Sequence, residues 1–164
     1  MKRTEASKSD EYGTPPELLP VIFKIAGFTP TLDPFATEAN AIFPHFITKE
    51  QNAFKTPWTE DAFVNGPFSK TKETVERCHN QWLENNINIV QLISARSMKM
   101  NYWHDIIEAN HIEYHPLRGG ICFLVNGKPY RDKKGRKSYH QQAFLVVIWH
   151  KREQLKRINL LDSL

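Results

Sequence analysis

The sequence is poor in cysteine and has no long apolar run. Cys78 and Cys122 are its only cysteines, so it holds no disulfide framework, and each lies in an apolar run where a thiol acts as a small hydrophobic side chain. No stretch approaches the roughly 20 apolar residues of a membrane-spanning helix. The charged first residues are not followed by the apolar segment of a secretion signal. Neither membrane insertion nor secretion is indicated, and we expect a cytoplasmic protein.

Metal-binding patterns are missing as well. The seven histidines are scattered, and no Cys, Asp or Glu cluster has the spacing of a zinc site, so we predict no metal site. With 164 residues, 40% of them hydrophobic, the chain is long and apolar enough for one domain with a core. We place that domain at residues 11–150, after a disordered tail at residues 1–10 and before a basic tail at residues 151–164.

Positive charge is concentrated in residues 128–137 and in the basic tail after Trp149, although the formal net charge is only +4. Residues 128–137, which we call the basic segment, contain six basic side chains and a single acid, Asp132. The six are Lys128, Arg131, Lys133, Lys134, Arg136 and Lys137. Such a cluster favours a polyanionic partner, and a solvated surface loop is the alternative explanation.

Apolar periodicity predicts alternating strands and helices. A capping box at Thr14 and Glu17, with Gly27 as a stop, predicts a helix over residues 15–26 that is kinked at Pro20. Further helices are predicted at residues 71–85 and 102–109. Short apolar runs predict strands at residues 31–33, 46–48, 62–64, 87–93, 112–114, 121–125 and 143–149. The order predicts an α/β fold whose mostly parallel sheet is closed by a C-terminal antiparallel strand pair.

Two of these strands end in polar side chains, Asp33 and Asn65. The carboxyl ends of parallel strands meet at one edge of a sheet, so both side chains should face the same crevice. After Asn65 the chain continues with Gly66, Pro67 and Phe68, a bend followed by a flat ring. That combination suits a planar polar ligand such as a nucleobase. An ordinary strand-to-helix turn has the same composition and is the alternative.

Asn65-Gly66-Pro67-Phe68 resembles the Asp/Asn-Pro-Pro-Tyr/Phe motif of amino-group methyltransferases that use S-adenosylmethionine. Other pieces occur in the matching order: residues 10–15, 31–41 and 46–50, then Trp58, then residues 94–96, 102–105 and 118–120. From about Asp10 to Trp149 the sequence is similar to the phage-type DNA N6-adenine methyltransferase (Dam-like) family. The collinear order is more specific than any single piece.

The resemblance implies a compact, Rossmann-like methyltransferase domain at residues 11–150, with S-adenosylmethionine as cofactor and adenine in duplex DNA as substrate. A phage-encoded member would act in the host cytoplasm. The resemblance assigns catalysis to Asn65, Gly66, Pro67 and Phe68. It assigns cofactor binding to Tyr12, Thr14, Pro15, Asp33, Pro34, Ala36, Glu50 and Asn65. The basic segment is then expected to bind DNA beside a base that has been flipped out of the duplex.

The sequence departs from the family pattern at Gly66, where the family has proline. Glycine keeps the backbone carbonyl but loosens it, so we expect an active enzyme that is slower than a Pro-Pro member. Asp33 also lacks the glycine-rich turn that usually follows it in methyltransferases. Two alternatives stay open. One is a nucleic-acid-binding protein that keeps the fold without activity, and the other is methylation of cytosine N4, of adenine in RNA or of a protein amide.

Overall fold

The computed structural model describes residues 12–153. The predicted tail at residues 1–10 and most of the one at 151–164 lie outside this range. The helices are η3 (Pro16–Leu18), α1 (Leu19–Ala26), η4 (Phe68–Lys70), α2 (Thr71–Asn85), η5 (Ala95–Lys99) and η6 (Trp103–Glu108), and η6 has π-helical geometry. The strands are β1 (Leu32–Asp33), β2 (His45–Phe46), β3 (Ala62–Val64), β4 (Ile89–Ser94), β5 (Glu113–Pro116), β6 (Leu124–Val125), β7 (Lys128–Pro129) and β8 (Phe144–Trp149).

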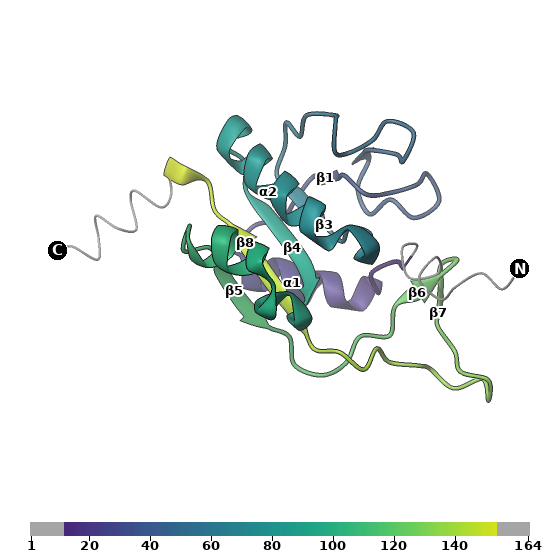
Figure 1. The fold of residues 1–164 in the computed structure, drawn as a ribbon. Helices are drawn as coiled ribbons and strands as arrows, with labels where there is room; N and C mark the ends of the chain where they lie inside the picture. The colour runs from purple at the N-terminus through teal and green to yellow at the C-terminus, as the bar shows by residue number, and fades with distance from the viewer. Residues whose placement is uncertain (1–11, 154–164) are drawn as a thin grey trace, which may run out of the picture.

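Six strands form one sheet in the order β2-β1-β3-β4-β8-β5 (Figure 1). β1 is parallel to β2 and β3, and β3 is parallel to β4, whereas β8 lies antiparallel between β4 and β5. The predicted α/β class, with a mostly parallel sheet and antiparallel C-terminal strands, is confirmed. Of the three runs predicted for the closing region, residues 112–114 and 143–149 contribute to β5 and β8.

The third run, residues 121–125, does not join the sheet. Its β6 pairs with β7 in a separate antiparallel ribbon. The two residues between the strands, Asn126 and Gly127, both have positive φ, at 52° and 76°. An Asn-Gly pair with this backbone makes the tightest hairpin turn, so β6 pairs with β7, while Leu124 also bridges to Gly13.

Helices cover both faces of the sheet. Successive residues of β4 alternate between the faces, so Ile89 and Ile93 pack in the core under α2 and η6, while Val90 and Leu92 pack in the core under α1. In Figure 1, α2 lies in front of the sheet and α1 behind it. With both faces covered, the carboxyl ends of the parallel strands are the natural place for a ligand.

The predicted helix at residues 71–85 coincides with α2, and its Val75 and Cys78 are buried. The first helix differs from the prediction. The chain enters through η3, and Pro20 falls in the first turn of α1, where the missing N–H costs nothing and no kink is needed. Neither η3 nor α1 has a side-chain hydrogen bond at its N-cap, so the predicted capping box is wrong. The Thr14 hydroxyl accepts a hydrogen bond from Asn65 instead.

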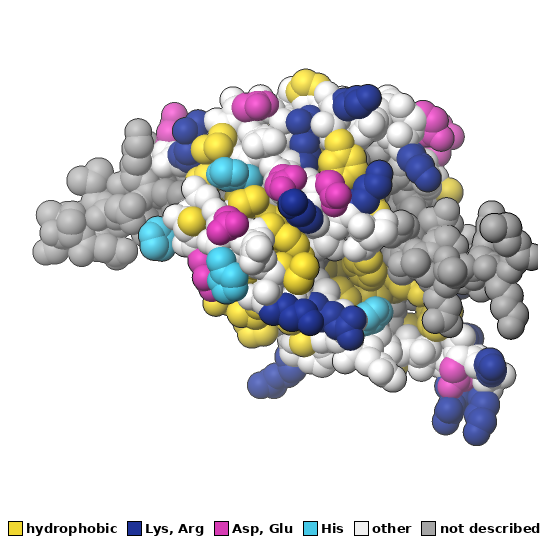
Figure 2. Space-filling model, viewed as in Figure 1, with side chains coloured by type: hydrophobic (Ala, Val, Ile, Leu, Met, Phe, Trp, Pro, Cys, Tyr) yellow, Lys and Arg dark blue, Asp and Glu magenta, His cyan; other side chains and the backbone are white. Residues whose placement is uncertain are grey.

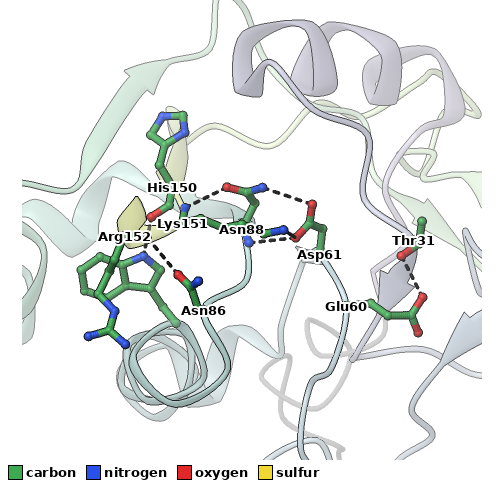
Figure 3. A network of polar contacts seen from close by, with 9 residues as sticks. Thr31, Glu60, Asp61, Asn86, Asn88, His150, Lys151 and Arg152 are labelled. Atoms are coloured by element: carbon green, nitrogen blue, oxygen red, sulfur yellow. Dashed lines mark hydrogen bonds and ion pairs between the residues drawn. The ribbon is translucent and has the colours of Figure 1, made fainter. Parts of the chain in front are cut away.

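A polar network holds the amino-terminal edge of the sheet together (Figure 3). Asp61 accepts hydrogen bonds from the backbone N–H and the side chain of Asn88, at 2.9 and 3.1 Å. Asn88 Oδ1 in turn accepts from the backbone N–H of Lys151 at 2.8 Å, and Asn86 Oδ1 accepts from that of Arg152 at 3.2 Å. These contacts fix the chain after β8 to the starts of β3 and β4, at the edge opposite to Asn65.

Candidate active site

Asn65 follows the last residue of β3 and is held by the segment before η3. Its Nδ2 donates to Thr14 Oγ1 at 2.9 Å and to the Tyr12 carbonyl at 3.4 Å. A carbonyl can only accept, so the amide nitrogen must be the atom that faces Tyr12. No hydrogen bond from residues 12–153 reaches Asn65 Oδ1. The site therefore offers one oriented acceptor at the carboxyl end of β3.

Gly66 lies against helix α2. A Cβ atom at this position would stand 2.8 Å from Cγ2 and 2.9 Å from Oγ1 of Thr74, closer than real Cβ contacts come. Thr74 is only 2% exposed, and its Oγ1 donates to the Lys70 carbonyl at 2.8 Å. Gly66 is not among the residues with positive φ, so the glycine is needed for this close approach and not for its backbone angles. Thr74 thus leaves no room for a side chain at position 66.

Phe68 belongs to a cluster of aromatic side chains. Its ring centroid lies 6.1 Å from that of Tyr12, 5.6 Å from Phe123, 6.1 Å from His140 and 5.9 Å from Phe144. We call these five residues the aromatic cluster. Burial, and secondarily the charge of a nearby arginine, lower the pKa of the His140 imidazole, so the ring is held neutral. Phe123 and Phe144 are buried in the core, and Tyr12, Phe68 and His140 are half-buried against them, next to the segment that holds Asn65.

Three members of this cluster, Phe123, His140 and Phe144, were not predicted as site residues. Phe123 directly precedes β6, His140 lies in the connection between β7 and β8, and Phe144 begins β8. Only the tertiary fold brings them to Phe68. The sequence offered only a weak indication of their role, because they are aromatic residues in the C-terminal third, whose strands are expected to end near the site.

Asp33 ends β1, next to the strand that carries Asn65. The β1-β3 register pairs Leu32 with Ala62, which places both polar strand ends at the same edge, as expected for parallel strands. Asp33 is 5% exposed, and its oxygens accept from the backbone N–H groups of Phe35 at 3.4 Å and Ile42 at 3.3 Å. Burial raises the pKa of this carboxyl to about 6, and the two weak hydrogen bonds only partly oppose that shift.

The other residues expected to bind the cofactor differ in how close they lie to Asp33 and Asn65. Pro34 and Ala36 are buried in the turn after Asp33, and Ala36 N–H donates to the Ile47 carbonyl at 3.2 Å. Pro15 precedes η3, beside the segment that binds Asn65. Glu50 is exposed in the turn after β2, and within residues 12–153 no hydrogen bond joins it to Asp33 or Asn65. The structure thus brings Tyr12 and Thr14 to Asn65 but leaves Glu50 apart.

The basic segment forms a compact hairpin between β5 and β8. Arg131 and Lys137 form an antiparallel bridge, and Asp132 Oδ1 accepts from the backbone N–H groups of Lys134 and Arg136 at 2.8 and 3.0 Å. The Arg136 guanidinium forms an ion pair with Asp132 at 2.9 Å. Figure 2 shows this cluster of Lys and Arg side chains around one acid, projecting at the lower right. The segment is ordered by Asp132, and Arg136 is partly neutralised.

The ribbon next to the basic segment is joined to the residues that hold Asn65. Gly13 N–H donates to the Leu124 carbonyl and Leu124 N–H donates to the Gly13 carbonyl, each at 2.9 Å. The Tyr130 ring lies 6.3 Å from the Tyr12 ring. The basic segment is therefore connected to the Asn65 site by direct contacts.

One surface groove lies apart from this site, and a second borders it at Pro15 and Lys137. One is at the end of α1, between Phe23, Gly27 and Phe28. The other lies between η3 and the β6-β7 ribbon, with Cys122 and Tyr139 in its wall. Neither contains Asn65 or Asp33. The candidate site is thus defined by the side chains that converge at the carboxyl ends of β1 and β3.

Membrane-spanning helices and metal clusters are both missing from residues 12–153. In that range no helix is long and apolar enough to cross a membrane. The same residues contain no group of three or more His, Cys, Asp or Glu side chains placed to hold a metal ion.

The six-stranded, mostly parallel sheet with helices on both faces is consistent with an α/β methyltransferase fold. A family model described as DNA N-6-adenine-methyltransferase (Dam) matches residues 2–162. The chain therefore belongs to this family, as the motifs predicted. Among curated proteins, none matches the sequence significantly.

Proposed function

We propose that this protein transfers a methyl group from S-adenosylmethionine to the N6 amine of adenine in DNA, with the adenine flipped out of the duplex and held against Phe68. The geometry of Asn65 carries the proposal. Its amide nitrogen is fixed by Tyr12 and Thr14, and its oxygen is left as an acceptor beside the aromatic cluster. Membership of the Dam family supports the substrate.

The adenine amine is a weak nucleophile because its lone pair is delocalised into the ring. Asn65 Oδ1 and the Gly66 carbonyl would each accept a hydrogen bond from this amine and draw the nitrogen toward tetrahedral geometry. S-adenosylmethionine, when bound, supplies the electrophilic methyl group. The protein's part is to position the amine and to provide oriented dipoles, without a covalent intermediate on the enzyme.

The end of β1 fits the cationic amino group of the cofactor. Asp33 is buried, and its two backbone hydrogen bonds are long, at 3.4 and 3.3 Å, which leaves its negative charge poorly compensated. An ammonium group would supply the missing compensation. We therefore assign the methionine portion of the cofactor to Asp33 and to the turn that contains Pro34 and Ala36.

Substrate binding would use the aromatic cluster and the basic segment together. A base in a duplex is out of reach of an enzyme site and must be extruded, and aromatic side chains stabilise it by stacking. The basic segment carries Lys133 and Lys134 on an exposed hairpin connected to the same site. We assign to this hairpin the phosphates near the flipped base.

Two substitutions at Asn65 test the catalytic assignment. Asn65→Ala removes the acceptor, and we expect kcat for labelled methyl transfer to DNA to fall about 100-fold or more, because the hydrogen bond is strongest in the transition state. Asn65→Asp keeps acceptor oxygens and should retain part of the activity. Calorimetry should show that Asn65→Ala still binds S-adenosylmethionine. Equal kcat for Asn65→Ala and the parent would contradict the assignment.

A further inference from the structure

Arg96, in helix η5 just after β4, has its guanidinium held by the side chain of Gln142. With the Gln142 amide oriented so that its oxygen faces the guanidinium, Arg96 Nη1 and Nε donate to Gln142 Oε1 at 2.9 and 3.0 Å, and Gln142 Nε2 donates to Ser94 Oγ at 2.6 Å. The opposite orientation of the amide would set its NH₂ group against the donors of Arg96, so hydrogen bonding requires the amide oxygen to face the guanidinium. Arg96 is therefore fixed in direction by a neutral partner.

The charge of Arg96 is left without compensation. Within residues 12–153 it forms no ion pair with an acid, whereas Arg136 of the basic segment is paired with Asp132 at 2.9 Å. A guanidinium carries five N–H donors, and Gln142 uses two of them. The remaining donors keep the fork geometry that binds phosphate oxygens in a bidentate manner. Arg96 has the properties of a preorganised anion-binding side chain.

Arg96 also lies beside the aromatic cluster. The Gln142 backbone N–H donates to His140 Nδ1 at 3.2 Å, and the His140 ring is 6.1 Å from Phe68. The strand before Arg96, β4, is the parallel neighbour of the strand before Asn65. Figure 2 shows Lys, Arg and His side chains along the lower edge of a hollow floored by hydrophobic side chains. A nucleotide whose base lay on Phe68 would have its phosphates near this edge.

We propose that Arg96 binds a phosphate of the target DNA strand next to the flipped nucleotide, with Gln142 as its positioning residue. This rests on the proposed function, because it takes the base on Phe68 as the fixed point. Contacts to phosphate position the duplex but carry no sequence information. Arg96 would thus contribute to the affinity for DNA of any sequence and to the alignment of the flipped nucleotide.

The salt dependence of DNA binding tests the proposal without requiring turnover. The dissociation constant of the full-length protein for a fluorescent adenine-containing duplex is measured by anisotropy over a range of NaCl concentrations. Each phosphate contact contributes about 0.9 to the slope of log affinity against log salt. We expect Arg96→Gln to reduce the slope by about 0.9 on every duplex tested, and Arg96→Lys to keep it.

Gln142→Ala separates position from charge. The variant keeps the charge of Arg96, so the salt slope of DNA binding should not change. Because Gln142 no longer holds the Arg96 side chain, the affinity for DNA should fall about three- to tenfold. Lys24→Gln, an exposed cation in the last turn of α1, is the control and should change neither quantity. Circular dichroism melting confirms that each variant is folded.

Three results would overturn the assignment. Unchanged slope and affinity in Arg96→Gln would remove Arg96 from the DNA contacts. An unchanged slope with an altered sequence preference would show a base contact in place of a phosphate contact. Parental affinity in Gln142→Ala would remove its positioning role. If the parent binds DNA with the expected Arg96 effect but transfers no methyl group, the proposed function fails and the phosphate contact stands.

Discussion

The contact between Gly66 and Thr74 allows a direct test of why this chain has Asn-Gly-Pro-Phe. In Gly66→Ala the new Cβ would stand 2.8 Å from Thr74 Cγ2 and 2.9 Å from Oγ1. Thr74 is buried and its hydroxyl is bonded to the Lys70 carbonyl, so it cannot turn away freely. Overpacking of this kind typically costs about 1–3 kcal/mol. The motif loop should shift away from α2 and carry the Gly66 carbonyl with it.

Thr74→Ala should relieve the overlap. It removes both close atoms and leaves Thr74 Cβ at 3.4 Å from the new methyl group, which is an ordinary contact. Alone, Thr74→Ala should cost about 1–2 kcal/mol for the lost hydrogen bond and methyl group. In the double variant the costs should not add, with a coupling energy of about 1–3 kcal/mol. Gly66→Pro should behave in the same way, because its ring begins at the same Cβ position.

The assay is a double-mutant cycle read by urea unfolding and by kcat for methyl transfer. We expect Gly66→Ala and Gly66→Pro to lose both stability and kcat, and Thr74→Ala to restore part of each. Lys72→Ala, on the exposed side of the same helix, is the matched control and should be additive with Gly66→Ala. Additive free energies for the Gly66 and Thr74 changes would refute the steric explanation. Full activity of Gly66→Pro with Thr74 intact would also refute the steric explanation.

Changes at Thr14, at Asp33 and in the basic segment should each have a measurable effect. Thr14→Val should lower kcat about fivefold, because Asn65 loses a hydrogen bond of about 1 kcal/mol, and Thr14→Ser should not. Calorimetry should show the affinity for S-adenosylmethionine falling about tenfold from pH 7 to pH 5, because the Asp33 carboxyl, with a pKa of about 6, loses its charge over this range. Asp33→Asn should abolish this pH dependence. The same raised pKa means that the folded protein without cofactor holds a proton the unfolded chain has lost, so stability should fall by about 2 kcal/mol as the pH rises from 4 to 6. Neutralising Lys133, Lys134, Arg136 and Lys137 together should reduce the salt slope of DNA binding by at most about 3.6, less if Arg136 stays paired with Asp132, and a parental slope would contradict the assignment.

Local patterns in the sequence predicted the framework of the fold well. The spacing of Val75 and Cys78 gave the bounds of α2, because one helix face must be apolar along its whole length. Asp33 and Asn65 were expected at one edge because parallel strands that are neighbours end on the same side. Both inferences depend only on residues close in sequence and on a general rule of α/β topology.

Contacts between distant segments were not predictable in this way. The pattern at Thr14 suggested a helix cap, but its hydroxyl binds Asn65, 51 residues away. The absence of proline at 66 suggested a looser loop, but nothing in the local sequence indicated that Thr74 of α2 packs against this position. The guanidinium of Arg96 and its partner Gln142 likewise meet only in the folded protein. Each case depends on how two distant segments of the chain pack against each other, and neither local propensity nor periodicity predicts that packing.

The identity of the methylated product tests the central claim most directly. The protein is incubated with unmethylated DNA and S-adenosylmethionine carrying a labelled methyl group, and the DNA is digested to nucleosides and separated. We predict label in N6-methyldeoxyadenosine for the parent and about 100-fold less or lower for Asn65→Ala. Label in N4-methyldeoxycytidine, transfer to RNA or protein but not to DNA, or DNA binding with no transfer at all would contradict the account.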